Sequence, residues 1–254
     1  MATNQSRSTV STGPTNVEKL RGLPWGVAWS MANSVFAQYT FFGSVFVLFL
    51  DELGLDKGQI GSLLSLLPFL GIIAIFIAST EARIGYKRVF VLSIAARTTT
   101  GILLLITPLV LAQFGPDAVL PFIVITVGAF GLFRATGFTA FYPWLQEQVP
   151  DNVRGKYTAI KNSLASLTAL VAVLVAGYVL GPDPGLSRFM ILIALGVAAG
   201  YVSVWVATKI PGGAPIRVDP AEESATQGMI SAARDPNFVR YLVGVGLVTL
   251  ATVP

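Results

Sequence analysis

Residues 89–113 read VFVLSIAARTTTGILLLITPLVLAQ, and Arg97 is the only charged side chain among them. A helix rises 1.5 Å per residue, so about 20 apolar residues are enough to cross the roughly 30 Å hydrocarbon core of a bilayer. Strands of a membrane barrel would instead alternate apolar and polar residues, which this stretch does not do. Lipid offers no partner to backbone N–H and C=O groups. The stretch is therefore predicted to be a transmembrane helix.

Similar apolar stretches recur along the chain, and together they predict an all-α, polytopic membrane helical bundle. The expected spans are residues 25–50, 59–79, 89–113, 118–145, 157–181 and 187–209. Residues 210–236 are rich in Pro and Gly at their start, which is typical of a flexible linker. We expect four parts: a cytoplasmic tail (1–24), a bundle of six transmembrane helices (25–209), a cytoplasmic linker (210–236) and the start of a truncated seventh helix (237–254).

The composition supports a membrane protein and excludes several other classes. Of the 254 residues, 54% are hydrophobic and 12% are charged, whereas about 25% are charged in soluble domains. The chain has no Cys and no His, which excludes disulfide scaffolds, zinc fingers and Ser-His catalysis. We therefore expect no enzyme, no catalytic residue, no bound metal and no cofactor. The formal net charge of +4 comes from residues scattered between apolar stretches, so we expect a lipid bilayer as partner and no nucleic acid.

The distribution of Lys and Arg predicts the orientation of the chain. Most of these residues lie in the N-terminal tail and in the alternate connections that would share its side of the membrane. In the opposite connections, only Lys57 and Arg188 are basic. Cytoplasmic loops carry an excess of Lys and Arg. We therefore predict a multi-pass protein of the plasma or inner membrane with a cytoplasmic N-terminus.

Two connections and one stretch within a span resemble motifs of the major facilitator superfamily. Residues 78–88 (ASTEARIGYKR) are similar to the family loop G-x-x-x-D-R-x-G-R-[KR] between helices two and three, although Ala stands where the family has Gly and Asp. Residues 132–137 (LFRATG) are similar to its fourth-helix pattern. Residues 149–156 (VPDNVRGK) are similar to its P-x-x-x-R-G-[KR] turn between helices four and five. The resemblance implies that the two loops form a cytoplasmic gate. The expected gate residues are the matching positions of both loops together with Glu81: Glu81, Arg83, Gly85, Lys87, Arg88, Arg154, Gly155 and Lys156.

The resemblance implies a secondary transporter that moves a small solute by alternating access between two six-helix bundles. This chain would supply the N-terminal bundle, and a C-terminal six-helix half would be missing from it. Two alternatives remain open. One is the six-helix permease subunit of an ATP-driven importer, for which only 210–236 has room for a coupling helix. The other is an intramembrane enzyme, although no Asp or Glu lies within the spans and Glu81 lies at the end of one.

Two arginines within the spans are the charged candidates for function. An ionisable group in the membrane is costly, by at least about 2.5 kcal/mol, and so marks a functional site. Arg97 lies near enough to the cytoplasmic end to snorkel, so we assign it a structural role. Arg134 lies deeper, and its guanidinium could hold a carboxylate or phosphate of an anionic or polar solute.

Neutral polar residues supply the other candidate contacts. The helical period places Asn33, Ala37, Thr40 and Ser44 on one stripe of the first span. In the family resembled, the first helix lines the central cavity. The full set of expected solute or coupling contacts is Arg134, Asn33, Gln38, Tyr39, Thr40 and Asn162.

Overall fold

The computed structural model describes residues 14–215 together with 236 and 240, and leaves aside the side chains of 71–80 and 82. The chain divides after residue 215 into two units, and residues 14–215 form the described part of the first. Of the second unit only Pro236 and Arg240 are described, and both are helical. The predicted seventh span and most of the predicted linker therefore lie outside the described residues. Regular structure in the described part is helical throughout, which confirms the predicted fold class.

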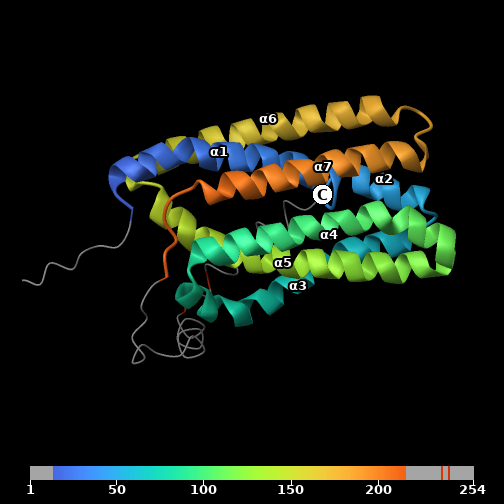
Figure 1. Ribbon diagram of the computed structural model, residues 1–254, viewed down its shortest axis with the longest axis horizontal. Helices are drawn as coiled ribbons and strands as arrows, with labels where there is room; N and C mark the ends of the chain where they lie inside the picture. The colour runs from blue at the N-terminus through green and yellow to red at the C-terminus, as the bar shows by residue number, and fades with distance from the viewer. Residues whose placement is uncertain (1–13, 216–235, 237–239, 241–254) are drawn as a thin grey trace, which may run out of the picture. The chain divides into compact units, whose positions relative to one another are not determined.

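The first unit is a bundle of long helices joined by short turns (Figure 1). The five segments 16–52, 86–114, 116–148, 151–180 and 185–208 are long and apolar enough to cross a membrane. The predicted span 59–79 falls within a further helix of 28 residues. The helices are α1 (Asn16–Tyr39), α2 (Ser44–Glu52), α3 (Lys57–Ile84), α4 (Tyr86–Phe114), α5 (Val119–Gln148), α6 (Arg154–Leu180) and α7 (Gly185–Thr208), with short 3-10 turns at Pro116–Ala118 and Asp151–Val153.

Helix α1 begins earlier than the predicted first span. The hydroxyl of Thr15 accepts a bond from the backbone N–H of Glu18, and the Glu18 carboxylate accepts one from the Thr15 N–H at 2.8 Å. This reciprocal capping box satisfies two N–H groups that a helix start would otherwise leave unpaired. Residues 16–24, which the sequence pattern assigned to the tail, are therefore helical.

The first predicted span falls within the segment 16–52, but it is not one unbroken helix, because the helix breaks between Tyr39 and Ser44. A side chain on Gly43 would place its Cβ 2.0 Å from the carbonyl oxygen of Gln38, so only glycine fits the bend. The Phe36 carbonyl accepts the last helical bond from the Thr40 N–H at 3.1 Å and a second bond from the Thr40 hydroxyl at 2.7 Å. Ser44 consequently starts α2 and does not share the α1 stripe of Asn33.

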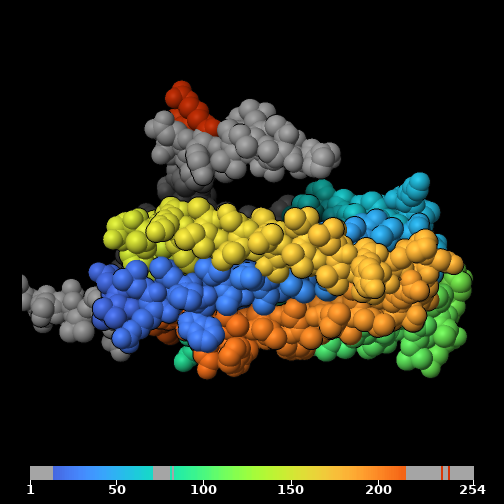
Figure 2. Space-filling view, turned by 90° about the horizontal axis from the view of Figure 1, so that it is seen from above, coloured from blue at the N-terminus to red at the C-terminus, as the bar shows by residue number. Residues whose placement is uncertain are grey.

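Helix α1 lies between α6 and α7, while α4 packs on α5 and α7, and α5 packs on α3 (Figures 1 and 2). Glycines allow the closest approach. A Cβ on Gly200 of α7 would lie 2.6 Å from a ring carbon of Phe36. One buried cluster surrounds Phe36, Phe41 and Phe130, and a second surrounds Trp29, Phe90 and Trp144. These clusters fix the helices that carry the candidate residues.

Candidate functional site

Arg134 of α5 is held between two aromatic rings. Its Cζ lies 4.8 Å from the ring centroid of Phe42, in the α1–α2 break, and 5.2 Å from that of Phe138, one turn along α5. Arg134 is only partly buried. Within the described residues its guanidinium makes no hydrogen bond or ion pair. A cation placed over aromatic faces keeps its N–H donors available, so Arg134 can still bind an anion.

Arg97 of α4 is enclosed by the bundle, with 3% of its surface exposed. Its Nη2 donates to Oδ1 of Asn33 at 2.6 Å, and its Cζ lies 4.8 Å from the Phe36 ring centroid. Its Nε has no partner among the described atoms. The helix contacts around Arg97 leave little room for a solute, and they favour the structural role predicted for it.

A third cation in this region was missed by the sequence reasoning. Lys161 lies in α6, and its Nζ is 5.8 Å from the ring centroid of Phe141 on α5. The sequence reasoning counted Lys161 among the basic residues of the cytoplasmic connections and therefore did not consider it as a charge within a span. The signal was present, since position 161 falls inside the predicted span 157–181.

The neutral candidates are separated by the structure. Tyr39 and Thr40 are buried, and the Tyr39 hydroxyl donates to the Ala172 carbonyl of α6 at 3.0 Å. Asn33 uses its carbonyl oxygen to bind Arg97. Gln38 is partly exposed on α1, and Asn162 is exposed on α6. Of these residues, only Gln38 and Asn162 present side chains that are both accessible and unbonded within the described part of the chain.

Helix α6 has two different exposed strips, because it contacts the bundle mainly through α1 (Figure 2). At helical spacing, one strip carries small and polar residues in the first half of the helix, and the other carries large apolar residues throughout. The first strip holds Ala159, Asn162 and Ser166, and it continues through the exposed apolar residues Leu170 and Val173 to Gly177. The second holds Ile160, Leu167, Val171, Leu174 and Tyr178. The second strip suits lipid, whereas the first suits water or another protein surface.

The turn between α3 and α4 is tight, and Gly85 adopts φ 101°, a conformation that favours glycine. Arg83 and Arg88 on either side are exposed. Lys87 instead turns inward, and its Nζ donates to the carbonyl of Ile210 at 2.6 Å. Of the expected gate residues in this turn, the structure therefore connects Lys87 to the segment that follows α7.

Residues 210–215, which we name the strap, join three helix ends. The Trp144 indole N–H donates to the Pro211 carbonyl at 3.0 Å, and the Gly213 N–H donates to the Glu147 carboxylate at 2.9 Å. The Lys87 N–H donates to the Gly213 carbonyl at 3.3 Å. Because Gly213 contacts both Lys87 and Glu147, the α3–α4 turn and the end of α5 lie at the same end of the bundle, as predicted from the basic residues.

Glu81 is buried near the same end, with 1% of its surface exposed, and its carboxylate accepts a hydrogen bond from the Thr139 hydroxyl of α5. From its position in the sequence it was expected to lie at the end of a span. Within the described residues no basic side chain pairs with it. The carboxylate of Glu81 therefore lies in the contact between α3 and α5, next to the predicted gate loop.

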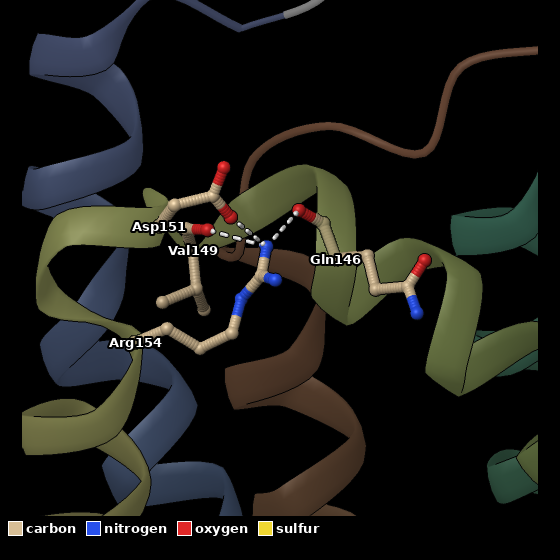
Figure 3. A network of polar contacts seen from close by, with 4 residues as sticks. All are labelled: Gln146, Val149, Asp151 and Arg154. Carbon is tan, nitrogen blue, oxygen red and sulfur yellow. Dashed lines mark hydrogen bonds and ion pairs between the residues drawn. The ribbon is translucent and has the colours of Figure 1, made fainter.

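The α5–α6 turn is organised by Arg154 (Figure 3). Its Nη2 forms an ion pair with Asp151 at 2.7 Å and donates to the carbonyls of Gln146 and Val149, each at 3.3 Å. These carbonyls belong to the end of α5, so the guanidinium caps that helix. Gly155 and Lys156 follow at the exposed start of α6.

Two apolar grooves on the described surface are lined by other residues than the solute candidates. One lies between the starts of α1 and α6, around Leu23, Val27 and Tyr157. The other lies between α3 and α5, around Gln59, Leu63 and Leu120. Arg134 and Gln38 are partly exposed and Asn162 is exposed, outside both of these grooves.

The sequence matches the family profile of the Major Facilitator Superfamily over residues 28–253. The chain belongs to the major facilitator superfamily. No curated protein and no solved structure matches it significantly. Members of this superfamily are membrane transporters, and the chain's long apolar helices agree with a multi-pass membrane protein. The predicted family is thereby confirmed, while the substrate does not follow from the match.

Proposed function

We propose that this major facilitator superfamily protein is a secondary transporter that moves a small anionic or polar solute by alternating access. The chain supplies the N-terminal bundle, and a C-terminal six-helix half packs on the face that carries Arg134, Gln38 and Asn162. The protein lies in the plasma or inner membrane with a cytoplasmic N-terminus, and it performs no catalysis. Rocking of the two bundles exposes the site to one side and then the other.

The observation that carries the proposal is a partly exposed arginine within a helix that is long and apolar enough to cross a membrane. Arg134 sits between Phe42 and Phe138 with its donors unused within the described residues. A charge in that position is expensive in lipid, and it is normally directed toward a bundle interior or a watery cavity. The polar residues Asn162 and Ser166 of α6 are also exposed, and we infer that they belong to the same solute pathway.

The gate at the cytoplasmic end is part of the same proposal. The glycine turn at Gly85, the buried Glu81 and the capped turn at Arg154 lie where the family has its gate loops. In an alternating-access cycle these turns must separate from and rejoin the other bundle. In this proposal Glu81, one residue before the position where the family has Asp, performs the role of that Asp.

An ATP-driven importer subunit is less well supported by the turns. A coupling helix needs a long cytoplasmic connection, but only one residue separates α3 from α4, and the short Asp151–Val153 turn links α5 to α6. The strap occupies the first six residues of the one connection with room for such a helix.

The absence of Cys from the chain allows a direct test by single cysteines. Ser166→Cys and Leu174→Cys are matched positions on α6, one on the polar strip and one on the apolar strip. Bilayer lipid excludes a water-soluble maleimide. In membranes we therefore expect it to label the Ser166→Cys variant quickly and the Leu174→Cys variant at least tenfold more slowly. Equal rates at the two positions would remove the proposed watery face.

Alternating access is tested by sidedness with the same reagent. Ser34→Cys on α1 and Ser166→Cys should react from both sides of the membrane, and a transported solute should shift the ratio of the two rates. A position that reacts from one side only under all conditions contradicts alternating access.

A further inference from the structure

One face of α5 joins two basic side chains through a pair of aromatic rings. Arg134, Phe138 and Phe141 follow each other at spacings of four and three, which places them on one face of the helix. The Phe138 and Phe141 centroids are 6.0 Å apart in an edge-to-face arrangement. Arg134 lies over Phe138, and Lys161 reaches across from α6 to lie over Phe141. We name this group the Arg134–Lys161 face.

The separation of the cations along α5 follows from helix geometry. Phe141 is seven residues beyond Arg134, which corresponds to a rise of about 10 Å. Arg134 is the deeper of the two basic groups, and Lys161 lies two turns from the start of α6 at Arg154. A solute with acidic groups at both ends could therefore contact both cations at once, with its stem against the rings.

The charge balance of the bundle favours an anion at this face. No Asp or Glu occurs in residues 25–50, 57–80, 89–116, 118–146 or 157–182. Glu81 is occupied by Thr139, and Glu147 by the strap. Arg154 pairs with Asp151, and in the described part of the chain neither Arg134 nor Lys161 forms an ion pair. Each unpaired cation at membrane depth costs a few kcal/mol, which a bound anion would offset.

The rings limit the chemistry of the solute between its acidic ends. Phe138 is partly exposed, whereas Phe141 is buried against Trp29 and Phe90 with 7% of its surface exposed. The ring of Phe138 and the exposed edge of Phe141 offer apolar surface and no hydrogen-bond donor, so a polyhydroxylated stem would lose its hydration without compensation. A hydrocarbon stem loses nothing and gains contact area.

We propose that the Arg134–Lys161 face binds an organic dianion, with an acidic group on each cation and a hydrocarbon stem across Phe138 and Phe141. This inference names the solute class of the proposed transporter and so rests on that function. It assigns Lys161 as a binding residue, and Phe138 and Phe141 as residues that select for the stem.

The test uses the purified protein and four probes: adipate, hexanoate and 1,6-hexanediol, which share a six-carbon chain, and inorganic phosphate. Binding is followed by the shift in melting temperature and by tryptophan fluorescence, because the ring centroids of Trp29 and Phe141 are 5.0 Å apart. We expect adipate to bind at least tenfold more tightly than hexanoate, and hexanediol and phosphate to produce no saturable signal. Tighter binding of phosphate than of adipate would overturn the role of the stem.

The variants identify the two ends of the site. R134Q and K161Q should each weaken adipate roughly tenfold and should abolish the preference for adipate over hexanoate. The matched control is K209Q, because Lys209 also lies over a ring, that of Trp205 at 5.5 Å, but outside this face. K209Q should bind as the unchanged protein does. If R134Q fails to fold, K161Q alone decides the issue, since Lys161 is only partly buried.

Two results separate this inference from the proposed function. Labelling of the polar strip on α6 together with equal binding of adipate and hexanoate overturns the dianion site and leaves the transporter. Loss of selective labelling on α6 overturns the transporter, and the dianion site falls with it. Equal loss of adipate binding in K209Q and K161Q also overturns the dianion site, since binding would then follow surface charge in general.

Discussion

The Nη2 atom of Arg97 on α4 donates a hydrogen bond to Oδ1 of Asn33 on α1 across 2.6 Å. Sequence patterns suggested different roles for the two residues, a structural one for Arg97 and a solute contact for Asn33. The bond joins these roles, because a buried guanidinium needs an acceptor and Asn33 supplies it. Asn33 therefore holds α1 and α4 together at the level of Phe36, whose ring centroid lies 4.8 Å from the Arg97 Cζ.

Replacing Asn33 should cost stability. Asn33→Ala leaves a buried cation with one acceptor fewer, and hydrogen bonds to charged groups contribute about 1.5–3 kcal/mol. We expect a loss of that size in the free energy of unfolding, measured by denaturation in mixed micelles. Ser34→Ala is the control, since among the described residues the Ser34 hydroxyl bonds the Ser30 carbonyl of its own helix and no other helix. Equal stability of the two variants would mean that the Arg97–Asn33 bond contributes nothing.

The α1–α2 break should depend on Gly43. A Cβ there would lie 2.0 Å from the Gln38 carbonyl oxygen, so Gly43→Ala must open the bend. Overpacking of this kind costs about 1–3 kcal/mol. Gly128→Ala on α5 is the matched control, because its Cβ would meet nothing within 4 Å and alanine favours a helix. We expect a lower melting temperature for the first variant and an unchanged or higher one for the second. The reverse order would show that the bend tolerates a side chain.

Apolar length and the positions of the basic residues were enough to predict the fold class and the helices. They could not predict the break, since residues 25–50 form one apolar run and the bend depends on a contact between Gly43 and Gln38. Nor could they predict that Glu81 turns toward Thr139, because the direction of a side chain at a helix end is set by the neighbouring helix. Lys161 was missed for a simpler reason: its charge counted as evidence for a loop, although its position lay within a span.

The strap should be released by a side chain at Gly213. Gly213 has φ 70°, and a Cβ there would lie 2.7 Å from the backbone nitrogen of Lys87 and 2.9 Å from a ring carbon of Trp144. A β-branched residue is strained in that conformation. We expect Gly213→Val to speed amide hydrogen exchange in 210–213, roughly tenfold for each 1.4 kcal/mol lost. Ala214→Val, at an exposed neighbouring position, should exchange as the unchanged protein does. Identical exchange in both variants would show that the strap does not depend on these close contacts.

The orientation of the bundle gives the last prediction. Gly213 ties the α3–α4 turn to the end of α5, so the basic turns at Arg88 and Asn152 share one end of the bundle. Cytoplasmic ends carry the excess of Lys and Arg, whereas Asp117 and Asp183 mark the opposite turns. In intact cells, an impermeant maleimide should label Asp117→Cys and Asp183→Cys. It should label Arg88→Cys and Asn152→Cys only after the membrane is opened. Labelling of Arg88→Cys in intact cells would invert the orientation, and labelling of only one of the two basic turns would contradict the bundle itself.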